Sequence, residues 1–259
     1  MSVQQSAKML ELLEFFARTQ KPASLAELSG ALGWPRSSTF SLMQVLAERG
    51  FLYEPRARGG YYPSPRWLTL IQKVADAEPI PDVLTTLVTE LSAETGETVA
   101  VGGPAGTSAV FLVVQESAAA IRYYAAVGNR LPIHATATGR ALLSQYSRTE
   151  RMSLYRRVTF EKYGPATPLS IEAVEAALRD AAGRGWHESH GDHAPDLTGV
   201  AVPLPLGERR LALVVAGPEF RMLSRLPAIA ATIKQALVRY AEALRTPALE
   251  LSHADRQAG

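Results

Sequence analysis

Four potential metal ligands fall within seven residues of the chain: His187, His190, Asp192 and His193. Imidazole nitrogens and a carboxylate at this spacing can hold Zn²⁺, and an open coordination position would make such a site hydrolytic. On a strand, however, His187 and His193 share one face while His190 points to the other. The cluster converges only if the chain turns near Gly191, with His134 as a distant additional ligand. A metal-dependent enzyme or a metal sensor is therefore an alternative hypothesis, and we expect neither a metal nor another cofactor.

Signatures of other catalytic chemistry are missing from the sequence. There is no cysteine, which excludes a disulfide framework, thiolate metal sites and a cysteine nucleophile and fits a reducing cytoplasm. No G-x-S-x-G, P-loop or dinucleotide-binding fingerprint occurs. We therefore predict that the protein is not an enzyme.

Length and composition indicate a globular protein of one small and one larger domain. The 259 residues are 47% hydrophobic and 20% charged, which excludes a disordered or fibrous chain. Glu11 and Glu14 interrupt the first apolar stretch, so it cannot serve as a signal peptide. No run approaches the roughly 20 apolar residues that cross a bilayer. We expect a soluble, cytoplasmic protein without a membrane partner.

The positive charge is concentrated in the first third of the chain. The whole formal excess of +2 lies within residues 1–78. The arginines between residues 33 and 66 are Arg36, Arg49, Arg56, Arg58 and Arg66. A local basic patch on a nearly neutral protein is typical of a surface that meets phosphates. From charge alone, an ordinary solvated surface is the better explanation. A DNA-binding fold around the arginines is needed to support a phosphate-binding surface.

Three short helices are predicted to precede a hairpin. The first has an apolar stripe at helical spacing, formed by Met9, Leu12, Leu13 and Phe16. Leu10 and Phe15 widen this stripe and favour contact with another subunit. Ser24 and Glu27 form a capping box that begins the second helix, and Gly33 ends it.

A third helix, from Pro35 to Gly50, is predicted to read DNA. Its packed face is expected to contain Ser38, Leu42, Val45, Leu46 and Arg49. Its exposed hydroxyls and amide suit base edges in a major groove, and its N-terminal end favours phosphate. The residues predicted to contact DNA are Arg36, Ser37, Ser38, Thr39, Phe40, Ser41 and Gln44.

An arginine-bearing hairpin follows this helix. Residues 51–53 and 61–62 are predicted strands, and Arg56 and Arg58 project from the turn between them. Such a wing touches the DNA backbone or minor groove beside the recognition helix. Residues 1–64 are therefore predicted to form a winged helix-turn-helix domain.

A linker helix is expected between the domains. Residues 67–77 have helical periodicity, and prolines bound the segment 65–79 on both sides. Such a helix is either a semi-rigid connector that transmits motion or a simple spacer.

The larger domain is predicted to cover residues 80–248, with a frayed tail at 249–259. The predicted strands are 98–102, 109–115, 121–126, 186–190, 199–204 and 211–216. The predicted helices are 82–95, 138–147, 149–157, 170–183 and about 223–245. Strands at both ends with helices between them indicate an α+β fold, with helices on one face of the sheet.

Nearly the whole chain resembles the IclR-type bacterial transcriptional regulators. The motifs that carry the resemblance are SLAELSGALGWPRSSTFSLMQVLAERGFL, GNRLPIHATATGRALL, GRGWHESHGDHAPDLTGVAVPL and ALVVAGP. The resemblance implies a winged helix, a linker helix and a GAF-like effector-binding domain. It also implies dimers or dimers of dimers on palindromic double-stranded DNA operators, and a ligand-responsive repressor or activator of a catabolic operon.

The resemblance also implies a pocket for a small organic effector. Small residues at a helix N-terminus, Thr136 to Gly139, suit a carboxylate, although tight packing around an ordinary N-cap explains them without the resemblance. The expected effector-binding residues are Thr136, Ala137, Thr138, Gly139, Ser189, Leu197, Gly199, Val214 and Ala216. Some relatives have an Asp, a Cys and two Ser where this chain has Ser189, Gly199, Val214 and Ala216. We therefore predict a bulkier, apolar carboxylate, such as an aromatic acid.

The predicted recognition helix also departs from the family pattern. Many relatives have His-Arg where this chain has Phe40 and Ser41. An Arg–guanine contact is thus missing, and the operator preference of relatives does not transfer to this chain.

Overall fold

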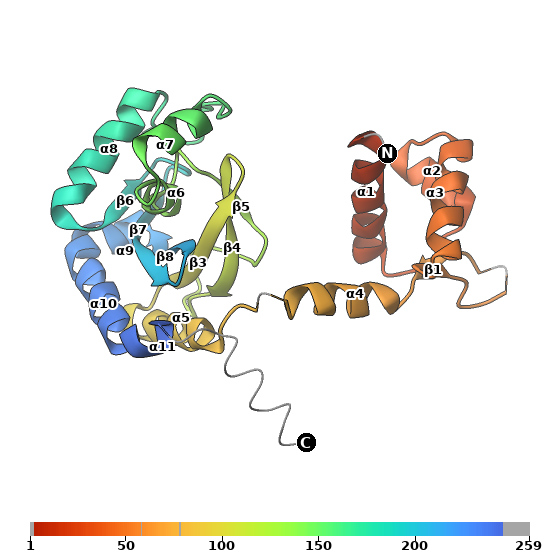
Figure 1. Ribbon diagram of the computed structural model, residues 1–259, viewed down its shortest axis with the longest axis horizontal. Coiled ribbons are helices and arrows are strands. Elements are labelled where there is room, and N and C mark those ends of the chain that lie inside the picture. The colour runs from red at the N-terminus through yellow and green to blue at the C-terminus, as the bar shows by residue number, and fades with distance from the viewer. Residues whose placement is uncertain (1–2, 58, 78, 246–259) are drawn as a thin grey trace, which may run out of the picture. The chain divides into compact units, whose positions relative to one another are not determined.

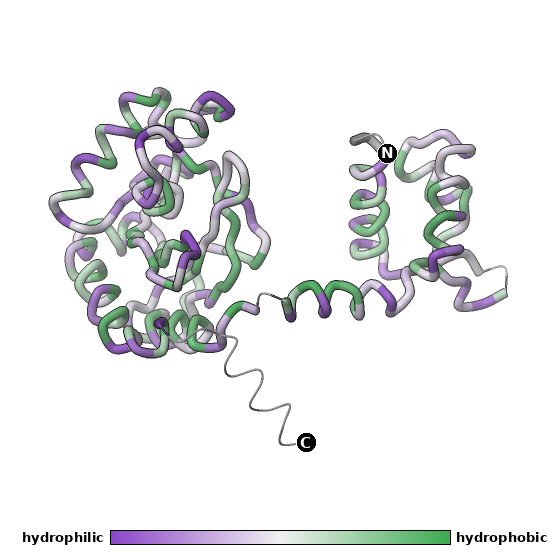
Figure 2. The backbone as a smooth tube through the Cα atoms, in the orientation of Figure 1, coloured by the Kyte–Doolittle hydropathy of each residue, from purple (hydrophilic) through white to green (hydrophobic). Residues whose placement is uncertain are grey.

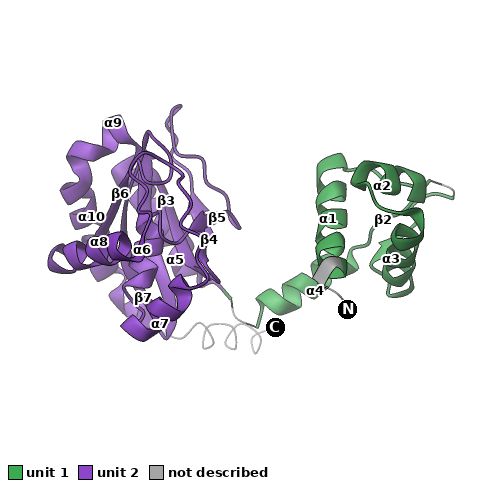
Figure 3. Ribbon diagram, turned by 90° about the horizontal axis from the view of Figure 1, so that it is seen from above, with its two compact units in different colours: residues 1–79 green, residues 80–259 purple. Residues whose placement is uncertain are grey.

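The computed structural model describes residues 3–57, 59–77 and 79–245. The chain divides into two compact units, residues 1–79 and 80–259 (Figure 3). Arg58 and the predicted tail 249–259 lie outside the described residues.

Unit 1 contains the predicted helices and hairpin (Figure 1). Its elements are α1 (Val3–Thr19), α2 (Leu25–Leu32), α3 (Arg36–Glu48), β1 (Leu52–Tyr53), β2 (Tyr62–Pro63) and α4 (Arg66–Ala75). The capping box of Ser24 and Glu27 is present at the start of α2. Gly33 ends α2 with φ 65°, a left-handed conformation that favours glycine. Strands β1 and β2 are antiparallel, so unit 1 is a winged helix-turn-helix.

Apolar side chains from all three helices and the wing form one core in unit 1. Its buried members include Leu12, Phe16, Leu28, Met43, Leu46 and Leu52. Phe15, which was predicted to widen the stripe toward another subunit, instead packs into this core at 8% exposure, whereas Leu10 is 57% exposed. The prediction for Phe15 is wrong because α1 buries a broader face than the four-residue stripe indicates.

Unit 2 is built on one six-stranded antiparallel sheet. Its strands are β3 (Thr98–Ala105), β4 (Ser108–Gln115), β5 (Arg130–Pro132), β6 (His187–His190), β7 (Leu197–Leu206) and β8 (Arg209–Pro218), in the order β5-β4-β3-β8-β7-β6. Its helices are α5 (Asp82–Thr95), α6 (Ala137–Leu143), α7 (Arg148–Tyr155), α8 (Ile171–Arg184), α9 (Glu219–Met222), a 3-10 turn (Leu223–Arg225), α10 (Leu226–Arg239) and α11 (Ala241–Arg245). The predicted α+β class is confirmed.

The two faces of this sheet differ in side-chain size. Alternate residues point to opposite faces, so Val99 and Val101 pack with α5 and α10, whereas Ala100 packs toward α6. The same alternation places Val200 and Val202 on the first face and Ala201 on the second. Helices therefore cover both faces (Figure 1). The prediction that helices cover only one face of the sheet is wrong, because a helix also packs on the small residues of the second face.

Two predicted elements of unit 2 also differ from the structure. Residues 121–126 form no strand, and the edge strand is β5 at 130–132 instead. The carbonyls of Ile121 and Tyr123 accept hydrogen bonds from side chains rather than from a neighbouring strand. The single long helix predicted for 223–245 is interrupted at Tyr240, between α10 and α11.

No helix among the described residues is long and apolar enough to cross a bilayer.

Candidate nucleic-acid interface and effector cleft

Helix α3 presents a polar and aromatic face to solvent. Its exposed residues predicted to contact DNA are Arg36, Ser37, Phe40, Ser41 and Gln44. Phe40 is 55% exposed even though burial of a phenyl ring is favourable. A ring beside hydroxyl and amide groups suits apolar contact with a thymine methyl group. This face has the chemistry needed to read base edges.

Thr39 lies on the buried side of α3. Its side chain is 0% exposed, and its hydroxyl donates to the carbonyl of Pro35 at 3.0 Å. Thr39, Met43 and Leu46 follow the i, i+4, i+7 spacing of one helix face and are the buried residues of the helix. The packed face is thus rotated from the predicted one, and Val45 remains 47% exposed. The predicted DNA contact of Thr39 and the predicted burial of Val45 are both wrong.

Two of the polar groups on α3 are held by neighbours. Ser38 is half-buried and accepts a hydrogen bond from Lys8 Nζ at 3.3 Å, which ties α3 to α1. The amide of Gln44 donates to Glu48 Oε1 at 2.9 Å. This contact orients the Gln44 amide before DNA is present, and orientation of this kind lowers the entropic cost of a base contact.

The wing presents an exposed arginine. Arg56 lies in the turn between β1 and β2 and is exposed. The hairpin is joined to the start of α2, because Ala23 and Tyr61 exchange backbone hydrogen bonds at 2.9 and 2.8 Å. The wing is therefore attached to the same core that positions α3. The predicted role of Arg58 falls on a residue outside the described ones.

The α6 residues predicted to bind an effector are closely packed. The Thr136 hydroxyl accepts a hydrogen bond from the Gly139 amide at 3.0 Å. A Cβ on Gly139 would overlap the Ile133 carbonyl, so only glycine fits at this position. Thr136, Ala137 and Thr138 are each less than a tenth exposed. The structure shows a tightly packed N-cap here, and its side-chain cap already occupies one of the free amides.

Predicted effector residues from three strands converge next to α6. Ser189, Gly199 and Ala216 are cross-strand neighbours on β6, β7 and β8. From the position of a Cβ on Gly199, Ser189 Oγ is 3.4 Å away, Ala137 Cβ 3.7 Å and Ala216 Cβ 3.8 Å. Val214 belongs to the same cluster of buried residues under α6. The positions predicted from widely separated motifs therefore form one small-residue cluster.

A large open cleft of about 1310 Å³ adjoins this cluster. Three segments line it: residues 121–124, residues 193–197, and residues 218–220 with 223–224. Tyr123 and Leu197 line the cleft and also pack against the small-residue cluster. Of the predicted effector residues, Leu197 alone lines this cleft. Tyr123 and Tyr124 were not predicted to line a site, because the run that contains them was interpreted as a strand, and Phe220 was not predicted either.

The histidine cluster does not form a metal site. Within residues 3–57, 59–77 and 79–245, no three His, Asp or Glu side chains lie close enough to hold an ion. His187 is buried, whereas His190 is exposed on the other face. Asp192 forms a buried ion pair with Arg140 at 2.7 Å. The alternative hypothesis of a metal-dependent enzyme or metal sensor therefore lacks the geometry that it requires.

Two family models match this chain. The family model for the C-terminal domain of IclR bacterial transcriptional regulators matches residues 72–251, and that for the IclR helix-turn-helix domain matches residues 7–56. The transcriptional repressor AllR of Salmonella paratyphi A is 25% identical over 227 residues, which cover 85% of this chain and 84% of AllR.

Two solved structures have the same fold. IclR of Thermotoga maritima has a TM-score of 0.74 and 18% identity, covering 95% of this chain and all of that one. An IclR homologue from Microbacterium hydrocarbonoxydans, solved in complex with 4-hydroxybenzoate, has a TM-score of 0.68 and 21% identity, covering 91% of this chain and 99% of that one.

Fold and family models together define a helix-turn-helix transcriptional regulator. Because the C-terminal family model spans more than half of the sequence, the chain belongs to the IclR family of bacterial transcriptional regulators.

Proposed function

We propose that the protein binds a double-stranded DNA operator with α3 in the major groove and the wing against the backbone or minor groove. Ser37, Phe40, Ser41 and Gln44 contact bases, while Arg36, Arg56 and Arg58 contact phosphates or the minor groove. The observation that carries this proposal is the solvent-facing set of hydroxyl, amide and aromatic groups on α3. Ser38 contributes only if its contact with Lys8 opens.

The operator is palindromic, and the protein binds it as a dimer or a dimer of dimers. Helix α4 supports self-association, because hydrophobic residues lie along it (Figure 2) and none of its residues is buried. Leu68, Ile71 and Val74 are 72%, 58% and 64% exposed. Their helical spacing makes an apolar surface of the kind that pairs with another subunit. Two-fold symmetry of the protein then requires two related half-sites in the DNA.

The effector is a small organic acid with an apolar, aromatic body. Its carboxylate lies near Thr136–Gly139 and Ser189, and its body packs against Tyr123 and Leu197 at the cleft. Gly199, Val214 and Ala216 offer space without polar side chains, and tyrosines 123 and 124 offer aromatic contacts. The 4-hydroxybenzoate complex of the Microbacterium homologue supports this chemical class.

The protein acts in the cytoplasm as a repressor of a catabolic operon. The name of the AllR relative supports repression. An effector changes the operator affinity only if it binds differently to the DNA-competent and DNA-incompetent arrangements of the two units. We propose that the aromatic acid favours the DNA-incompetent arrangement.

A gel shift on the upstream region of the protein's own gene tests this function. The panel contains 4-hydroxybenzoate, benzoate and glyoxylate. An aromatic acid should lower operator affinity by about 5- to 150-fold, and Gly199→Val, which fills the small-residue cluster, should bind DNA normally without this response. A panel without any effect would contradict the proposal, and tight calorimetric binding of glyoxylate alone would overturn the aromatic class.

A further inference from the structure

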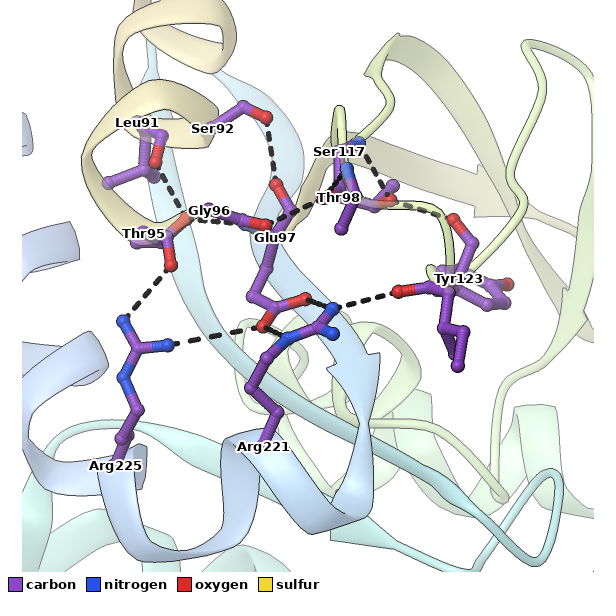
Figure 4. A network of polar contacts seen from close by, with 12 residues as sticks. Leu91, Ser92, Thr95, Gly96, Glu97, Thr98, Ser117, Tyr123, Arg221 and Arg225 are labelled. Carbon is purple, nitrogen blue, oxygen red and sulfur yellow. Dashed lines mark hydrogen bonds and ion pairs between the residues drawn. The ribbon is translucent and has the colours of Figure 1, made fainter.

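We propose that Arg221 is the positioning residue of the effector cleft, and that its pair with Glu97 fixes the cleft wall at residues 121–124 to the C-terminal end of α5. This inference rests on the proposed function of the cleft. It concerns residues that lie outside the predicted effector set. Figure 4 shows the contacts that carry it.

Glu97 is a fully buried carboxylate whose charge is balanced by Arg221. The Glu97 side chain is 0% exposed. Arg221 donates from Nε to Oε1 at 2.5 Å and from Nη2 to Oε2 at 2.7 Å, a two-pronged contact (Figure 4). A Cβ at position 217 would overlap the Glu97 carboxylate, so Gly217 makes room for it. Such geometry restrains both partners more than a single surface contact does.

Arg221 also holds the cleft wall. Its Nη2 donates to the carbonyl of Ile121 at 3.0 Å. Two residues later, the carbonyl of Tyr123 accepts a hydrogen bond from Thr98 Oγ1 at 2.7 Å. Because residues 121–126 join no strand, these two carbonyl contacts order the wall on either side of Arg122, whose side chain pairs with Glu116 at 2.8 Å. Arg221 itself belongs to α9 and lies between two groups of cleft-lining residues, 218–220 and 223–224.

The contacts around Glu97 also extend to the C-terminal end of α5. Arg225 donates to the carbonyl of Thr95 at 3.0 Å and lies 4.0 Å from Glu97. Ser92 donates to the carbonyl of Glu97 at 2.8 Å. A ligand that rests on the wall is therefore linked to Arg221 and Glu97, and through them to α5, the helix that follows the linker segment in the sequence. This arrangement couples occupancy of the cleft to the C-terminal end of α5.

Trypsin cleavage after Arg122 in the full-length protein tests the positioning role. The key variant is Glu97→Met/Arg221→Met, because removing both charges of the pair leaves no uncompensated charge on the buried side of the contact and costs little stability. We expect its Tm to stay near that of wild type. The fragment ending at Arg122 should nevertheless form about tenfold faster, since the lost hydrogen bond from a charged donor held the wall closed.

Matched variants separate positioning from general stability. Arg225→Met removes a neighbouring arginine but leaves the contact with Ile121, so its cleavage rate should equal that of wild type. Should the double variant not fold, Arg221→Lys decides, because lysine keeps the charge and loses the two-pronged geometry. A folded double variant that is cleaved at the wild-type rate would overturn the proposal.

Calorimetry with 4-hydroxybenzoate gives the functional readout. We expect the double variant to bind it at least about tenfold more weakly than wild type does, because a loosened wall must be ordered on binding. Equal binding by the two proteins would show that the pair does not position the cleft. If wild type itself binds no carboxylate, the proposed effector class fails, and the proteolysis result still decides the role of Arg221.

Discussion

Burial sets the protonation of three histidines of unit 2. His187 is 5% exposed. Burial, assisted by the cations of Arg140 and Arg184, lowers the pKa of His187 to about 4. Burial also lowers the pKa of His193 and of His134. These imidazoles are therefore neutral at physiological pH, which is consistent with packing roles in the unit 2 core.

The lowered pKa of His187 predicts a pH-dependent stability. Its pKa in the folded state lies below the ordinary value of 6.5, so the unfolded state binds more protons between pH 6.5 and 4. The free energy of unfolding must then fall as the pH falls through this window. From pH 7 to pH 5, His187 should account for a loss of about 2 kcal/mol.

Urea unfolding at pH 7 and pH 5 measures this contribution. His187→Gln, which cannot be protonated, should show a smaller loss than wild type, and the difference between the two losses is the quantity of interest. His190→Gln is the matched control, because His190 is exposed. Identical losses in wild type and His187→Gln would show that the imidazole is not buried in the neutral form.

At the scale of elements, the position of α6 depends on the absence of a side chain at Gly139. The backbone of Ile133 occupies the space where a Cβ would lie. Gly139→Ala should therefore destabilise unit 2 by more than about 2 kcal/mol and displace α6 from the small-residue cluster.

Gly183 provides a matched control within another helix. It lies in α8, and a Cβ there would meet nothing within 4 Å. Gly183→Ala should raise stability by up to about 1 kcal/mol, because alanine favours a helix interior. Thermal unfolding of both variants measures the contrast. A harmless Gly139→Ala would mean that α6 does not approach the 133 segment so closely.

Elements with local signals were predictable from the sequence. The capping box of Ser24 and Glu27, the left-handed Gly33 and the two short strands of the hairpin all depend on neighbouring residues. They are confirmed because their physics is contained in a few positions.

Elements whose conformation depends on distant partners were not predictable in the same way. The run at 121–126 has strand-like residues, but its carbonyls contact Thr98 and Arg221 instead of a strand. The buried face of α3 is set by the core that α1, α2 and the wing supply, so Thr39 and Val45 were assigned to the wrong sides. The cleft itself was missed because three separated segments form it.

The predicted effector set illustrates both cases. Ser189, Gly199 and Ala216 meet Ala137 because the antiparallel register of three strands brings their positions together. That convergence followed from the family resemblance, since no spacing in the sequence encodes it. The carboxylate Glu97 and its partner Arg221 are 124 positions apart, and neither the composition nor the periodicity of the sequence pairs them.

At the scale of the whole molecule, the charge distribution agrees with a division of labour. The formal excess of +2 lies in the first 78 residues, which include the winged helix-turn-helix. Unit 2 carries the cleft, the small-residue cluster and the contacts that join them to α5. DNA recognition therefore belongs to the winged helix-turn-helix of unit 1, and we propose that unit 2 controls it.

The arginines of the wing should provide binding without sequence selectivity. Arg56→Ala combined with Arg58→Ala should weaken binding to all DNA sequences and lower the slope of log affinity against log salt by about 2, because each phosphate contact releases counterions. Arg239→Ala is the control, because Arg239 is an exposed residue of α10 that contacts Glu94. Fluorescence anisotropy across a salt series measures the slope, and an unchanged slope would argue against the wing.

Recognition of a particular DNA sequence through α3 is the central claim, and competition anisotropy on the protein's own promoter tests it most directly. With labelled promoter DNA at about 0.1 M salt, the promoter should compete at least about a thousandfold better than a scrambled duplex of equal length. Gln44→Ala should reduce this preference while leaving the affinity for scrambled DNA unchanged. Equal competition by the two duplexes with the wild-type protein would contradict the claim.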